Sequence, residues 1–254
     1  MTAVFGSVRG TGTVFARQMR PVLRRPYMIV FGMLQPLLYL VLFAPLLGGL
    51  AGAEGQDPWQ WFIPGLLVML VLFTAGFAGF GLLPEMASGA HERLLATPTG
   101  RVALLLGRVL RDVVIVVAQM ALILVLVVPL GFETTVVGAL AGLALLAVLG
   151  VGMATLSYLA ALIAKQTYVF APIIQTVMMP LLLLSGVLLP MELAPGWLYT
   201  LSRLNPVAHM VDAARVLFAG GPWGPTVLFG WGMAIAVTVL ALAVGTRVMS
   251  RSNS

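Results

Sequence analysis

Six stretches of this sequence are each apolar for long enough to cross a lipid bilayer. The hydrocarbon core of a bilayer is about 30 Å thick, so a spanning helix needs roughly 20 mostly apolar residues. The stretches are residues 27–50, 61–83, 109–130, 136–163, 168–189 and 225–249. Only 9% of all residues are charged, whereas soluble domains carry about a quarter. The chain is therefore predicted to be an all-α polytopic membrane protein, a single transmembrane domain over residues 1–254.

The basic residues predict which side of the membrane each loop occupies, because Lys and Arg collect in short cytoplasmic loops. Those that fall on one side of six spans are Arg9, Arg17, Arg20, Arg24, Arg25, Arg93, Arg101, Arg108, Arg111, Lys165, Arg247 and Arg251. The other side has only Arg203 and Arg215, together with the acidic residues Glu54, Asp57 and Glu133. We therefore expect both termini to be cytoplasmic.

The net charge of +6 is better explained by lipid headgroups than by nucleic acid. The basic residues are spread along the predicted inner membrane edge, and the sequence contains no nucleic-acid-binding module. The chain has no cysteine, which excludes disulfides and thiolate metal sites. Residues 1–25 lack the apolar core of a cleaved signal peptide, so the first span is expected to direct insertion.

Residues 1–26 are expected to lie along the inner membrane surface. Apolar side chains and arginines are mixed in this segment, as is typical of a helix whose apolar side rests in the interface. Gly6, Gly10 and Gly12 weaken the helix, which is therefore predicted over residues 13–24. A disordered basic tail is the alternative.

The longest predicted cytoplasmic loop, residues 84–108, is expected to present a short helix parallel to the membrane. Residues that recur every three or four positions, and so share one helical face, are Glu85, Gly89, Glu92 and Ala96. Thr97 followed by Pro98 is typical of an N-cap and first helical position, so a new helix is predicted to start there and run into the third span. The alternative is a solvated connector.

Residues 190–224 are predicted to form a re-entrant hairpin on the outer side. Prolines separate two helix-compatible stretches, 195–204 and 206–218, which are too short to span a bilayer. Trp197, Tyr199 and Trp223 are expected at headgroup level.

The second of these stretches contains ionisable residues. Asn205 and Pro206 are typical of a helix start. His209, Asp212 and Arg215 follow at intervals of three, which allows an Asp212–Arg215 ion pair, and Arg203 is expected in the same cluster. Two interpretations stay open: a polar lining or outer gate of a transport path, or a structural ion pair and cap that hold the hairpin.

The chain offers little catalytic chemistry. His91 and His209 are the only histidines and are predicted on opposite sides of the membrane, so neither a histidine metal site nor a Ser–His–acid triad can form within one chain. No phosphate-binding P-loop is present. No charged residue lies centrally in a span, Asp112 being the nearest, which disfavours an ion-coupled carrier.

Small residues four positions apart permit close contact between helices. Such pairs are Ala75 and Gly79, Gly138 and Gly142, and Gly230 and Ala234.

Three motifs, in this order, resemble the membrane (permease) subunit of type 2 ABC exporters, and in particular its daunorubicin-resistance type. The first runs from Arg25-Pro26 through Gln35-Pro36-Leu37-Leu38-Tyr39; the second holds Glu85, Gly89, Glu92-Arg93-Leu94-Leu95 and Thr97-Pro98; the third holds Asn205-Pro206, His209, Asp212 and Arg215. The resemblance covers nearly the whole chain.

This resemblance implies a permease that pairs with a second copy, or a similar chain, and with two copies of a separate ATPase subunit that binds ATP and magnesium. It implies no cofactor, metal or catalytic residue in this chain. The implied ATPase-coupling residues are Glu85, Gly89, His91, Glu92, Arg93, Leu94, Leu95, Thr97 and Pro98. The implied outer gate comprises Asn205, Pro206, His209, Asp212 and Arg215.

The resemblance also implies a bacterial inner-membrane location, with an amphiphilic or hydrophobic cargo such as a drug, antibiotic or lipid. The mostly apolar spans favour such a cargo over a polysaccharide. The alternatives are an ion-coupled carrier, or a non-energised channel or structural membrane component.

Overall fold

The computed structural model describes residues 2–24, 27–50, 58–95, 100–188 and 191–251, and these residues are almost entirely helical. The helices are α1 (Thr2–Arg24), α2 (Tyr27–Leu50), α3 (Pro58–Gly76), α4 (Leu83–Ala87), α5 (Ala90–Leu95), α6 (Arg101–Val127), α7 (Val136–Ala164), α8 (Thr167–Leu183), α9 (Gly196–Leu204), α10 (Pro206–Phe218) and α11 (Pro225–Arg251), with short 3-10 turns η1 (Ala78–Gly81), η2 (Val128–Leu130) and η3 (Met191–Leu193). Predicted features at Arg25, Pro26, Glu54, Asp57, Thr97 and Pro98 lie outside the described residues.

Among the described residues, four helical segments are long and apolar enough to cross a membrane. They are Pro58–Ala87, Arg101–Leu130, Val136–Ala164 and Pro225–Val248, and they correspond to the predicted second, third, fourth and sixth spans. The predicted first and fifth spans correspond to shorter described apolar segments, Gly32–Phe43 and Thr167–Leu183. The all-α polytopic class is confirmed, and the count of six spans stays a prediction.

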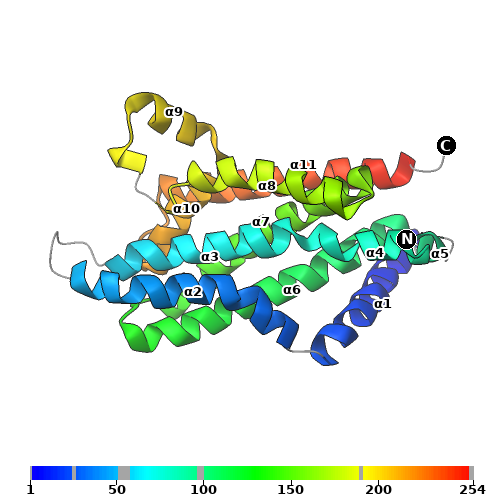
Figure 1. Ribbon diagram of the computed structural model, residues 1–254, viewed down its shortest axis with the longest axis horizontal. Helices are drawn as coiled ribbons and strands as arrows, with labels where there is room; N and C mark the ends of the chain where they lie inside the picture. Colours follow the sequence, from blue (N-terminus) through cyan, green and yellow to red (C-terminus); the bar gives the residue numbers. More distant parts are fainter. Residues whose placement is uncertain (1, 25–26, 51–57, 96–99, 189–190, 252–254) are drawn as a thin grey trace.

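The long helices run side by side, and the start of α1 and the end of α11 lie toward the same end of the bundle as α4 and α5 (Figure 1). We call this the inner end. The hairpin formed by α9 and α10 lies at the opposite, outer end (Figure 1). The start of the first helix and the end of the last helix thus lie at the same end of the bundle, as an even number of membrane crossings requires. The assignment of the inner end to the cytoplasm stays a prediction.

Three predicted boundaries differ from the structure. The second span is interrupted after Gly76 by η1, where the Gly79 N–H donates to Ser157 Oγ (2.9 Å) instead of continuing a regular helix. The fifth stretch, predicted to reach 189, ends as a helix at Leu183, and the chain turns at Gly186, whose positive φ of 75° suits glycine. The N-terminal helix begins at Thr2 rather than 13; its packing along α6 compensates for its glycines.

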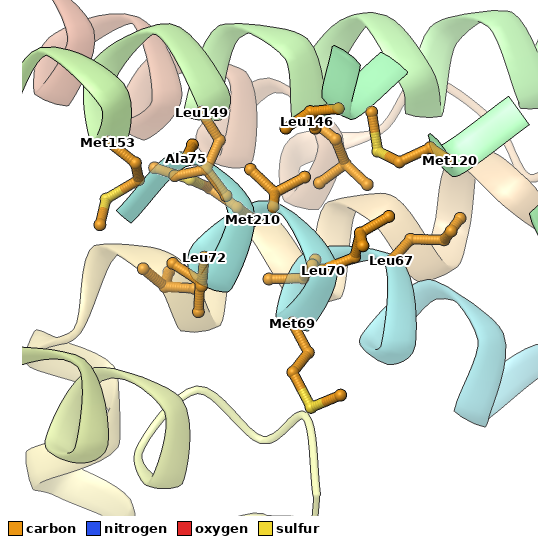
Figure 2. Packing of buried hydrophobic residues seen from close by; sticks show 14 of the residues in the cluster. Leu67, Met69, Leu70, Leu72, Ala75, Met120, Leu146, Leu149, Met153 and Met210 are labelled. Carbon is orange, nitrogen blue, oxygen red and sulfur yellow. The ribbon is translucent and has the colours of Figure 1, made fainter. Parts of the chain in front are cut away.

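Helix α3 lies at the centre of the hydrophobic core. Each residue from Ile63 to Leu72 is buried, and α3 packs against α2, α6, α7, α8 and α10. Leu67 of α3 lies in this core with Met120 of α6 and Leu146 of α7 (Figure 2). A helix that is apolar on every side is buried on every side.

The small residues noted in the sequence lie at helix contacts. A Cβ on Gly138 would lie 2.2 Å from the Leu217 carbonyl oxygen, and one on Gly230 would lie 2.3 Å from Ala213 Cβ. Both contacts bring α10 against its neighbours, α7 and α11. The predicted close packing at these glycines is confirmed.

Replacing Gly79 with alanine should destabilise the protein. The new Cβ would lie 2.4 Å from the Ser157 carbonyl oxygen, so α3–η1 and α7 must separate, at a cost of about 1–3 kcal/mol. Gly232→Ala is the control because a Cβ there meets no atom within 4 Å. We expect thermal unfolding in detergent to show a lower midpoint for Gly79→Ala alone. Equal midpoints for the two variants would contradict this packing.

Candidate functional site

The loop predicted to carry one short helix forms two, α4 and α5, joined at Ser88 and Gly89. Gly89 adopts a positive φ of 66°, a conformation that glycine reaches without steric cost and that ends a helix. The prediction that Glu85, Gly89 and Glu92 share one continuous helical face is therefore wrong.

Helix α6 begins at Arg101, with Gly100 in an extended conformation at its N-cap. The predicted start at Thr97 and Pro98 falls outside the described residues. The helix starts later than predicted, because Gly100 is not helical. Its continuation is as predicted, because α6 runs unbroken through Val127 in the third span.

Arg108 of α6 joins both short helices to the bundle. Its side chain is 3% exposed and donates to the Glu85 carboxylate of α4. Its Nη1 lies 3.4 Å from Nδ1 of His91 on α5. A buried guanidinium is tolerated when it is paired in this way. Arg108 therefore fixes α4 and α5 against α6.

The predicted coupling residues divide into inward-facing and outward-facing groups. His91 is buried and Glu85 is half-buried, and both serve the Arg108 contact. Glu92 and Arg93 are exposed. Leu94 and Leu95 are half-buried. Only part of this segment is thus available to contact another protein.

Further hydrogen bonds extend this contact from α1 to α7. Gln18 of α1 donates from Nε2 to Glu85 (3.3 Å) and accepts from Arg111 Nη1 (3.4 Å). Arg111 Nε donates to Asp112 (2.9 Å), and the Tyr158 hydroxyl of α7 donates to the other Asp112 oxygen (2.5 Å). We call the group the inner polar cluster; its members are Gln18, Glu85, His91, Arg108, Arg111, Asp112 and Tyr158.

Sequence reasoning missed most of the inner polar cluster. It noted Asp112 as the ionisable residue nearest a span, but assigned no partner to Arg108 or Tyr158. The available signal was the spacing of Arg108, Arg111 and Asp112, which places them within one turn at the inner end of a helix.

His91 lies in an environment that disfavours its charged form. Burial is the largest cause of its lowered pKa, and the positive charge of Arg108 is the second. The carboxylates of Glu92 and Glu85 oppose the shift without cancelling it.

At the outer end, the hairpin forms almost as predicted. Helices α9 and α10 occupy Gly196–Leu204 and Pro206–Phe218. Asn205 caps α10 by accepting from the Val207 N–H (3.0 Å), and its Nδ2 donates to the Leu181 carbonyl of α8 (2.8 Å). Helix α10 packs against α3, α7 and α11, so it enters the bundle rather than lying on its surface.

The ionisable residues of the hairpin pair differently from the predicted possibility. Asp212 accepts from Arg203 Nη1 (2.7 Å), and His209 Nε2 lies 3.0 Å from the Arg203 carbonyl oxygen. Arg215 instead reaches backbone carbonyls of other elements, Trp61 (3.3 Å) and Gly186 (2.8 Å). Its guanidinium also lies over the Trp61 ring, 4.5 Å from the centroid.

These contacts correct the Asp212–Arg215 pair that the spacing allowed, because chain folding brings Arg203 to Asp212. They give the hairpin residues a structural role, joining α10 to α3, α8 and α9. A role in lining a transport path stays a prediction.

Arg215→Gln should destabilise the protein more than Arg203→Gln. Arg215 makes charge-assisted hydrogen bonds to two backbone carbonyls, and their loss should cost about 2 kcal/mol or more. The Arg203–Asp212 pair is part-exposed, with side chains 34% and 27% accessible, and should contribute less than about 1 kcal/mol. Thermal midpoints in detergent measure the difference. A larger loss for Arg203→Gln would contradict the role given to Arg215.

The stability of the inner end should fall in mild acid. Because the folded-state pKa of His91 is lowered, the unfolded state binds the proton more readily. The contribution of neutral His91 to stability is fully present above its unfolded-state pKa of about 6.5. This contribution is lost as the pH falls below that value. Hydrogen exchange of the 90–95 amides should therefore accelerate on acidification more in wild type than in His91→Gln, after correction for intrinsic exchange. Parallel profiles would exclude His91 as the cause.

Comparison with known proteins agrees with this architecture. Residues 9–219 match the family model described as ABC-2 type transporter. This match includes α4, α5, the inner polar cluster and the outer hairpin.

The chain is also similar to a protein of Streptomyces coeruleorubidus named daunorubicin resistance ABC transporter permease protein DrrB1. The two are 26% identical over 216 residues, which cover 84% of this chain and 76% of the relative. The chain belongs to the ABC-2 type transporter family and is the membrane subunit of an ABC exporter, a family in which the ATPase is a separate subunit.

Proposed function

We propose that two copies of this permease bind two copies of the ATPase subunit and export an amphiphilic or hydrophobic cargo, such as a drug, antibiotic or lipid, across the bacterial inner membrane. Both termini face the cytoplasm in this proposal. The partner subunit binds ATP and magnesium, and this chain supplies the path. The relative whose printed name includes daunorubicin resistance supports a drug-like cargo.

The arrangement of α4 and α5 is the observation that carries the proposal. Glu92 and Arg93 are exposed on α5, while His91 on the same helix contacts the buried Arg108. A movement of a subunit docked on these exposed residues is therefore transmitted to α6 through the contact between His91 and Arg108. Through Gln18 and the Asp112–Tyr158 bond, the same movement reaches α1 and α7.

Coupling to ATP requires that the docked subunit make different contacts in two states of the permease. The short helices suit this role because the polar contacts of Arg108 link both α4 and α5 to α6. At the outer end, the hairpin formed by α9 and α10 closes the exit in this proposal.

Several polar side chains of the spans are occupied by hydrogen bonds within the protein, which favours a largely apolar path for the cargo. Gln119 of α6 is buried and accepts from the Thr74 hydroxyl of α3 (3.2 Å). The Thr155 and Thr238 hydroxyls donate to the carbonyls of Val151 (2.7 Å) and Val148 (2.8 Å). These groups are partnered within the protein, and a cargo that needs few hydrogen bonds fits best. Asp112, the candidate ion ligand of a coupled carrier, is likewise bound by Arg111 and Tyr158.

Glu92→Lys should weaken docking of the ATPase subunit at least about tenfold, since reversing a charge at the centre of a polar contact costs a few kcal/mol. Glu133→Lys is the matched control, because it reverses an exposed acidic residue in the connection between α6 and α7. Copurification with the ATPase subunit and native mass spectrometry measure docking. Efflux of a lipophilic dye from cells measures transport.

We expect wild type and Glu133→Lys to yield two permeases with two ATPase subunits, and Glu92→Lys to yield permeases alone with no efflux. Unchanged docking in Glu92→Lys would contradict the role of α5. A wild-type permease that never recovers an ATPase subunit, after gentle extraction with nucleotide, would favour the ion-coupled alternative.

A further inference from the structure

A small cavity lies between α1, α5 and α6 at the inner end of the bundle. Its volume is about 90 Å³. Its lining residues are Thr13, Val14, Arg17, Gln18, Leu94, Leu104 and Arg108. Drug-sized ligands occupy sites of about 300 Å³ or more, so this cavity suits a single small group rather than the exported cargo.

The cavity flanks a close contact between α1 and α6. A Cβ on Gly107 would lie 2.7 Å from the Val14 side chain and 3.0 Å from the Thr11 carbonyl oxygen, so the two helices meet here with no space between them. Val14 belongs to both this contact and the cavity wall. The third wall is Leu94 of α5. The cavity is therefore bounded by α1 and α6, which pack closely against each other, and by Leu94 of α5.

The charged groups of the lining are both positive. The lining contains two guanidinium groups, of Arg17 and Arg108, and no carboxylate. Arg108 is buried and binds Glu85, whereas Arg17 is exposed, and no described carboxylate forms an ion pair with it. Gln18 and Thr13 add polar side chains. Arginine and such neutral donors are the groups that bind phosphate oxygens in proteins.

The remaining lining is apolar, which favours a lipid over a soluble anion. Val14, Leu94 and Leu104 form this part. On α1, Val14 is buried, whereas Arg17, Arg20 and Arg24 are exposed, the pattern of a helix at a membrane surface. Basic pockets between helices at the cytoplasmic membrane edge bind anionic headgroups.

We propose that this cavity binds the phosphate group of an anionic phospholipid from the inner leaflet. Arg17 donates to the phosphate oxygens, Arg108 contributes positive charge from beneath, and the three apolar residues contact the glycerol end of the acyl chains. Because Gln18 and Arg108 also belong to the inner polar cluster, the bound lipid stiffens the contact of α1 with α6.

The test measures lipid binding to the full-length permease, so its result does not depend on transport or on the ATPase partner. Native mass spectrometry in mild detergent quantifies bound phosphatidylglycerol, with phosphatidylcholine as the zwitterionic comparison. Arg17→Gln should weaken phosphatidylglycerol binding about fivefold, the effect of one arginine near an anionic surface. Arg20→Gln is the matched control, because it removes the same charge from an exposed residue of α1 that does not line the cavity.

Thr13→Phe provides a second variant, which fills the cavity without changing the charge. It should reduce phosphatidylglycerol binding as Arg17→Gln does, and the thermal midpoint verifies that each variant is folded. Equal losses in Arg17→Gln and Arg20→Gln would overturn the proposal in favour of general surface attraction. Displacement of the lipid by millimolar inorganic phosphate would overturn the lipid as ligand in favour of a soluble anion. Undiminished binding in Thr13→Phe would place the lipid elsewhere.

Discussion

A bilayer interior offers no hydrogen-bond partners, and this constraint determines where polar groups occur in the protein. Several hydroxyl and amide side chains of the spans bond to the protein itself, as Thr74 does to Gln119 and Ser157 to the Gly79 N–H. Ionisable groups lie toward the two ends instead. The protein thus has an apolar centre around α3, an inner polar cluster, and a second set of polar contacts at the outer hairpin.

Polar side chains bond to different kinds of partner at the two ends of the bundle. At the inner end, side chains bond to side chains across α1, α4, α5, α6 and α7, so the contacts can be exchanged for others when the helices move. At the outer end, Asn205 and Arg215 bond to backbone carbonyls of Leu181, Trp61 and Gly186. Backbone carbonyls are fixed by their helices and turns, which makes the outer contacts the more rigid set.

Features that depend on local sequence were predictable, and those that depend on chain folding were not. The lengths of apolar stretches located the long helices, and Asn205 followed by Pro206 located the start of α10, because capping acts within one turn. Arg203 was expected in the same cluster as Asp212, but their ion pair was not predicted, since Arg203 lies on a different helix. The turn at Gly89 was missed because i, i+3 and i+4 spacing does not reveal a positive φ.

The break after α3 was likewise not predictable from local sequence, and it affects how a movement passes between the helices. Hydropathy predicts an unbroken span through residue 83, since Phe77, Phe80 and Leu82 are as apolar as the preceding helix. The helix changes to a 3-10 turn where the Gly79 N–H bonds to Ser157 of α7, a contact too close for any side chain at position 79. The 3-10 turn therefore separates α3, fixed at its outer end by Arg215, from α4, fixed to α6 by Arg108. In the proposed docking at α5, a movement of α4 would therefore reach α7 through the close contact at Gly79 and α6 through Arg108.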